Sequence, residues 1–145
     1  MADNYCESSS FVKVPKNKIE KARLIIERIE NELRNDDNEG YVGFTSEITP
    51  IPPHNGVWIM GNSDFTPEHT ERLVRALVDE LNLKGIFVCS WSYSCSKPLI
   101  DEFGGGAFAI SKDCKTIWID ALSEVQRLAS ISVKEASVRR GRFRS

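Results

Sequence analysis

Residues 86–95 read Ile-Phe-Val-Cys-Ser-Trp-Ser-Tyr-Ser-Cys, and from Phe87 onward apolar or thiol side chains alternate with small or polar ones. Successive side chains of a β-strand point to opposite faces of the sheet, so this period of two predicts a strand. One face carries the side chains of Phe87, Cys89, Trp91, Tyr93 and Cys95. The other face carries Ser90, Ser92 and Ser94. We expect the aromatic face to pack in the core and the serine face, if uncovered, to form a polar platform for a partner protein or a polar ligand.

The chain before this strand predicts two helices and two further strands. Apolar residues recur at three- and four-residue intervals after Pro15 and again after Thr66, which is typical of helices with one buried face. Pro67 suits the first turn of the second helix. Residues 41–48 and 57–60 are rich in the β-branched and aromatic residues of strands, and the prolines between them stop any sheet there.

The chain after it predicts a hairpin and a last helix. Residues 107–110 and 116–119 are two short strands joined by five residues, and helical spacing returns from residue 121. The expected class is α+β, with a mostly antiparallel sheet of four to five strands packed by two longer helices, and a short C-terminal helix. The connection from 57–60 through the second helix to residue 86 is compatible with one parallel strand pair.

Composition and length indicate one globular domain. The chain has 145 residues, of which 41% are hydrophobic and 28% charged. We expect a flexible lead-in at 1–10, where three consecutive serines and few apolar residues offer little to bury, and a single α+β domain at 11–133. Residues 134–145 are expected to be a basic disordered tail.

Charge is unevenly distributed along the chain. Residues 134–145 hold five Lys or Arg against one Glu, a net charge of +4, which leaves −6 for the remainder of a chain whose net charge is −2. An acidic body is unlike the usual nucleic-acid-binding domain, so nucleic acid is expected to contact the tail arginines if it binds at all. The competing interpretation of the tail is a solvated end.

Apolar runs are too short to cross a bilayer, and the N-terminus lacks the pattern of a secretory signal. We therefore expect a cytoplasmic protein with free thiols and no membrane partner.

Residues 95–106 read Cys-Ser-Lys-Pro-Leu-Ile-Asp-Glu-Phe-Gly-Gly-Gly between two predicted strands. Consecutive glycines weaken a strand and permit backbone conformations closed to other residues. One explanation is a structural bend or bulge that leads into the hairpin. The other is functional, in which exposed amides beside Lys97 hold an anion or a partner. A phosphate-binding loop would lead into a helix rather than a strand, and is excluded. The candidate binding residues are Lys97, Asp101, Glu102, Gly104, Gly105, Gly106, Ser92 and Ser94.

Candidate catalytic residues do not form a convincing set. His69, Cys89 or Cys95, and Glu102 offer a base, a nucleophile and an orienting group, but their spacing does not favour that arrangement. The cysteines fall on the apolar face, and adjacent Asp101 and Glu102 point apart in an extended segment. The Cys spacing is also wrong for a zinc site. We predict no catalytic residue, no metal and no cofactor, and favour a non-enzyme.

The same region resembles a family of short accessory proteins of tailed bacteriophages and prophages. The resemblance rests on Ser90-Trp91, on Cys-Ser-Lys-Pro at 95–98 and on Glu-Phe-Gly-Gly-Gly-Ala at 102–107, and it covers roughly residues 57–120. It implies a setting, a phage or prophage accessory gene acting in a bacterial cytoplasm. It implies no activity and no catalytic residue.

These observations favour a non-enzymatic accessory protein that binds a host or phage macromolecule, expected to be a protein, through residues 95–106. The alternative is a protein that sequesters a phosphate-bearing nucleotide with the loop amides and Lys97. An enzyme of unknown type ranks third. The oligomeric state stays open, although an exposed strand edge would favour a dimer.

Overall fold

The computed structural model describes residues 4–36, 40–99 and 103–142. The fold is α+β, as predicted. These residues contain one antiparallel sheet of six strands and three helices, rather than four to five strands and two longer helices. The elements in chain order are β1 (Asn4–Lys13), α1 (Ile19–Asp36), β2 (Thr45–Thr49), β3 (Gly56–Gly61), α2 (Pro67–Glu80), β4 (Ile86–Cys95), β5 (Gly104–Ser111), β6 (Ile117–Asp120) and α3 (Ala121–Arg142), with a single 3-10 turn at Lys16–Lys18 before α1.

The strands lie in the order β2-β3-β1-β4-β5-β6. The first six elements follow the β-α-β-β-α-β order of the split βαβ, or ferredoxin-like, motif, and β5 and β6 extend its sheet at one edge. The suggested parallel pair of β3 with β4 is wrong. Strand β1 lies between them and pairs antiparallel with both, so α2 crosses over β1 to reach the next position in the sheet.

Strand β1 replaces most of the flexible lead-in expected at residues 1–10. From Cys6 onward its side chains alternate between more and less buried, and Val12 faces the core while Phe11 faces away from it. The serines of its inner face are accommodated by hydrogen bonds: Ser8 Oγ donates to the carbonyl oxygen of Ser90 at 2.6 Å. Small polar residues therefore occupy the middle of the sheet because the neighbouring strands supply their partners.

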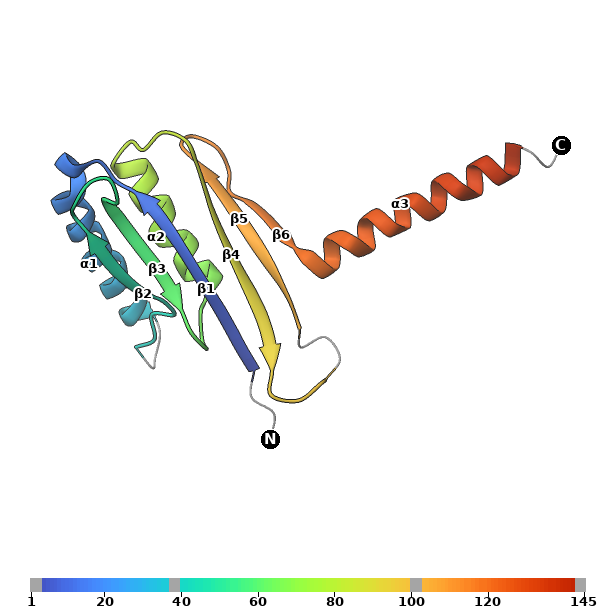
Figure 1. Ribbon diagram of the computed structural model, residues 1–145, viewed down its shortest axis with the longest axis horizontal. Coiled ribbons are helices and arrows are strands. Elements are labelled where there is room, and N and C mark those ends of the chain that lie inside the picture. The colour runs from blue at the N-terminus through green and yellow to red at the C-terminus, as the bar shows by residue number, and fades with distance from the viewer. Residues whose placement is uncertain (1–3, 37–39, 100–102, 143–145) are drawn as a thin grey trace.

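Helices α1 and α2 both lie against one face of the sheet (Figure 1). Their apolar stripes and the inner side chains of the strands form the core. Fully buried residues include Ala22 of α1, Val57 and Ile59 of β3, and Leu73 and Leu77 of α2. Within the described residues, the other face of the sheet carries no helix (Figure 1).

Helix α3 is longer than the short helix expected after residue 121. It runs for 22 residues and includes residues 134–142, which were expected to be a disordered tail; residues 143–145 lie outside the described residues. Asp120 accepts a hydrogen bond from the Ser123 amide at 3.0 Å and so caps the first turn. No proline follows to end the helix before Arg142. Figure 1 shows α3 extending away from the sheet.

Candidate binding face

The uncovered face of the sheet, here called the open face, displays the outward side chains of all the strands. Phe11 of β1 and Trp58 of β3 are directly opposite each other in the ladder, and 43% and 42% of their surfaces are exposed. The Trp58 indole N–H donates to Ser9 Oγ at 2.7 Å, which fixes the orientation of the ring. Large aromatic side chains held exposed on a sheet are typical of a surface that binds another molecule.

A shallow polar depression of about 500 Å³ lies beside this aromatic pair. Strand β1 contributes Glu7 and Ser9, β4 contributes Ser90 and Ser92, and Asn62 follows β3 at its rim. The serine row of β4 therefore faces away from the helices, as its alternation predicts, because Cys89 between these serines is buried in the core. Hydroxyls and one carboxylate equip the depression to exchange hydrogen bonds with a polar or cationic partner.

A second part of the open face is apolar and is here called the apolar trough. Its floor is Ala107 and Ala109 of β5, and larger apolar side chains of the neighbouring strands lie on both sides of Ala109 and on the β6 side of Ala107. Val88 on β4 and Ile117 on β6 flank Ala109 on either side, and Ile119 flanks Ala107. Val88 and Ile117 are 61% and 64% exposed, so the trough has no cover within its own described chain.

The connection between β4 and β5 is exposed where it is described. Lys97 is at the surface, and its carbonyl accepts a hydrogen bond from the Leu99 amide at 2.8 Å. The predicted binding residues Asp101 and Glu102 lie outside the described residues. Since Asn4 of β1 pairs with Cys95, the connection emerges at the same end of the sheet as the start of β1, close to the strand segments that carry Ser92 and Ser94.

The three glycines belong to β5 rather than to a loop, and the structure gives two of them a packing role. A Cβ on Gly105 would meet the Trp91 carbonyl oxygen, and one on Gly106 would lie 2.7 Å from the Trp91 ring and 2.6 Å from the Ile119 carbonyl oxygen. Gly104 has a φ of 144°, in the region that favours glycine. The strand therefore needs Gly106 to pass the Trp91 indole and Gly105 to pass the Trp91 carbonyl at close range.

Trp91, Phe108 and Trp118 form an aromatic cluster on the helix side of the sheet. The ring centroids of Trp91 and Phe108 are 6.0 Å apart, and those of Phe108 and Trp118 are 5.2 Å apart. This cluster joins β4, β5 and β6, and Phe108 is buried. The aromatic row predicted on β4 thus continues across the hairpin.

Two residues considered for a catalytic set, His69 and Cys89, have structural roles, and the Cys6 thiol resembles that of Cys89 in its raised pKa. His69 Nδ1 donates to the carbonyl oxygen of Val42 at 2.7 Å and ties α2 to the segment before β2. Burial raises the pKa of the Cys89 thiol, and burial, followed by the negative charge of Glu68, raises that of Cys6 to about 11. Both thiols are therefore protonated at neutral pH and are poor nucleophiles.

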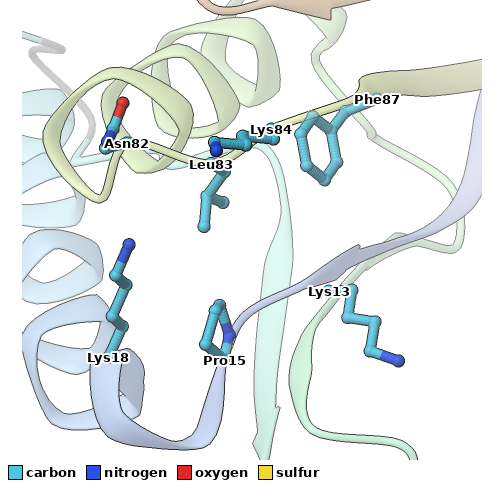
Figure 2. A pocket seen from close by; sticks show the side chains of 7 residues that line it. All are labelled: Lys13, Pro15, Lys18, Asn82, Leu83, Lys84 and Phe87. Carbon is cyan, nitrogen blue, oxygen red and sulfur yellow. The ribbon is translucent and has the colours of Figure 1, made fainter.

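A larger pocket, of about 700 Å³, opens at the other end of the sheet, and Pro15, Leu83, Phe87 and three lysines line it (Figure 2). Lys18 Nζ donates to the Leu81 carbonyl at 2.6 Å and so satisfies the end of α2. In Figure 2 the ammonium group of Lys13 points away from the other labelled side chains. The pocket is far from Lys97, because the β4–β5 connection lies at the opposite end of these strands.

Sequence reasoning missed Glu7 and Ser9, which form one side of the depression. Residues 5–12 do not alternate between apolar and polar side chains, so no local pattern in the sequence predicts this strand.

No protein-family model matches the chain, and no curated protein and no solved structure matches it significantly. In the described part of the chain, no helix is both long and apolar enough to span a membrane. Among the same residues, no group of three or more His, Cys, Asp or Glu side chains is placed to hold a metal ion.

Proposed function

We propose that the chain is a non-enzymatic binding protein whose polar depression, together with the adjoining β4–β5 connection, binds a segment of a partner protein. The observation that carries this proposal is the uncovered depression lined by Glu7, Ser9, Ser90 and Ser92 beside the exposed Trp58. A peptide segment with lysine or arginine side chains fits this chemistry, because Glu7 supplies a negative charge and the serines supply further acceptors.

The phage resemblance supplies the setting of the proposal. An accessory protein acting in a bacterial cytoplasm would meet host or phage proteins there, and an exposed connection beside a polar sheet face offers both specificity and access. Lys97 belongs to this proposed interface, as do Ser92 and Ser94 of the neighbouring strand.

The test is co-purification of tagged protein from its host, comparing Glu7→Arg and Ser92→Arg with the unaltered chain. Each substitution places a bulky cation in the depression, so we expect at least a tenfold loss of the bound partner. Glu27→Arg on α1 is the matched control, because Glu27 is exposed in the helix layer rather than on the open face. Unchanged partner recovery by both folded depression variants would refute the proposal.

A second candidate is the sequestration of a small phosphate-bearing ligand, with Lys84 of the pocket that Pro15 and Phe87 line, rather than Lys97, as its cationic partner. Native mass measurement of the same purified samples separates the two candidates. Extra small-molecule mass that disappears in Lys84→Glu and persists in Ser92→Arg would assign ligand binding to that pocket.

A further inference from the structure

Helix α3 lacks the packing that normally stabilises a helix. None of residues 121–141 is buried, and the main contacts of the helix with its own chain are to β5 and β6. Exposed large apolar side chains occur along most of its length: Leu122, Val125, Leu128, Ile131, Val133 and Val138. Because helices owe most of their stability in proteins to tertiary packing, an arm of this kind is expected to have a partner surface.

The apolar side chains cover a broad arc of α3. At 100° per residue, the polar residues gather on one stripe: Ser123, Gln126, Arg127, Ser130, Lys134 and Ser137. Apolar residues occupy most of the rest of the circumference, where Glu124, Ser132, Glu135, Arg139 and Arg140 also lie. A two-helix coiled coil needs only a narrow seam repeating every 3.5 residues, and α3 has no such repeat. The broad arc favours packing on an extended surface such as a sheet.

The apolar trough has the matching shape and length. Ala109 lies between Val88 and Ile117, and Ala107 lies between the small Ser90 and Ile119, so a helix can settle along β5. Strand β5 has 8 residues and is about 26 Å long, which is the length of roughly 17 helical residues. The apolar part of α3, from Leu122 to Val138, has that length.

The area is adequate for a stable dimer. The part of α3 that lies along β5 is about 26 Å long and about 11 Å wide, so its footprint is about 290 Å². Two symmetric contacts, each counted on both surfaces, would bury about 1,150 Å², above the roughly 1,000 Å² that a specific interface needs.

The distribution of charge favours a contact between α3 of one copy and the sheet domain of another copy over a contact between two α3 helices. Residues 121–145 carry six Lys or Arg against two Glu, a net charge of +4, whereas residues 1–120 carry −6. Two such arms repel each other, and each is attracted to the body of another copy.

We infer that the protein forms a symmetric dimer in which α3 of each copy lies in the apolar trough of the other. The occupant of the trough is therefore a second copy of this chain. This dimer goes beyond the proposed function, because it uses the arm and the β4–β6 part of the open face and leaves the β1 side of the polar depression, with Glu7 and Ser9, to the partner protein.

Native mass spectrometry and light scattering of the full chain test the dimer. We expect the unaltered protein to have twice the chain mass. Leu128→Glu on the arm, and Val88→Glu or Ile117→Glu on the walls of the trough, should each give folded monomers, because each buries a charge in both contacts. Leu24→Glu is the matched control, since Leu24 is an exposed apolar residue of α1 outside the open face, and it should remain dimeric.

Mixing the variants identifies the contact. A Leu128→Glu chain keeps a good trough and a Val88→Glu chain keeps a good arm, so an equimolar mixture should recover a mixed dimer held by one intact contact. A dimer broken by Leu128→Glu and unaffected by both trough variants would mean that the arms pair with each other, and would overturn the inference. An unaltered chain that stays monomeric at its highest soluble concentration would also overturn it. Glu7→Arg, on β1 and two strands away from β5, should leave the mass unchanged, so failure of the dimer is distinct from failure of partner binding.

Discussion

Trp91 sets the local geometry of β5 because its side chain and its carbonyl leave no space on the neighbouring strand. The ring lies against Gly106 and the carbonyl against Gly105, and the same ring contacts Phe108 in the core. The sequence suggests that this run of glycines is a flexible or ligand-binding segment. In the structure, an aromatic side chain packs against it at close range. At this scale the packing explanation accounts for the glycines at 105 and 106 without a ligand.

Gly106→Ala should destabilise the protein by about 1–3 kcal/mol, because the new methyl group must displace either the Trp91 ring or the Ile119 backbone. Urea unfolding followed by tryptophan fluorescence measures the loss. Gly141→Ala is the control: a Cβ there meets nothing within 4 Å, and alanine favours a helix over glycine, so it should cost no stability. Equal stability of both variants would show that the tight fit at Gly106 is absent.

Ion pairs between α1 and α2 hold the helix layer together on its solvent side. Arg28 donates to both carboxylate oxygens of Glu80, with Nη1 at 2.7 Å from Oε1, and Arg72 of α2 pairs with Glu32 of α1 at 2.9 Å. The hydrogen bond from Arg28 lowers the pKa of Glu80 below its ordinary value of 4.5. Both side chains of the Arg28–Glu80 pair are more than one third exposed, so solvent screening keeps its contribution small.

Arg28→Gln should lower the free energy of unfolding by about 0.5 kcal/mol at pH 7. Because the folded pKa of Glu80 is depressed, this contribution is complete above pH 4.5 and is lost as the pH falls through the lower, folded value. The difference from the unaltered protein should therefore disappear in acid, as measured by urea unfolding at a series of pH values. Arg23→Gln, which removes a charge paired only within α1, is the control. A difference that persists at the lowest pH would exclude the ionic origin.

The whole molecule combines a two-layer body with an arm that the body does not support. In the body, the helices cover one face of the sheet and their side chains are buried against it. Helix α3 and the open face both expose apolar side chains, and neither is covered by another part of the same described chain. The proposed dimer removes both exposures with a single symmetric contact.

Hydrogen exchange should show that α3 depends on the dimer contact for its stability, whereas α1 and α2 do not. Amides of α1 and α2 should be protected in every folded variant, because the core depends on them. Amides of α3 should be protected in the unaltered protein and exchange rapidly in the monomeric Val88→Glu variant, where the arm has no surface to pack on. Rapid exchange of α3 in the unaltered protein at high concentration would contradict the dimer.

The sequence by itself determined the elements whose patterns are local. The period of two over 86–95 identified β4 and the direction of its serine face, and the spacing after Pro15 and Thr66 identified α1 and α2. These patterns suffice because the buried face of a single element is encoded in the period of its own side chains.

Only the tertiary structure decided where the elements lie. It placed β1 at the centre of the sheet, although residues 4–10 have too few apolar side chains to predict a strand, because two neighbouring strands complete its hydrogen bonds. It also separated β3 from β4, put the glycines against Trp91 and left α3 outside the core. Those features depend on contacts between residues far apart in the chain, which no local pattern records.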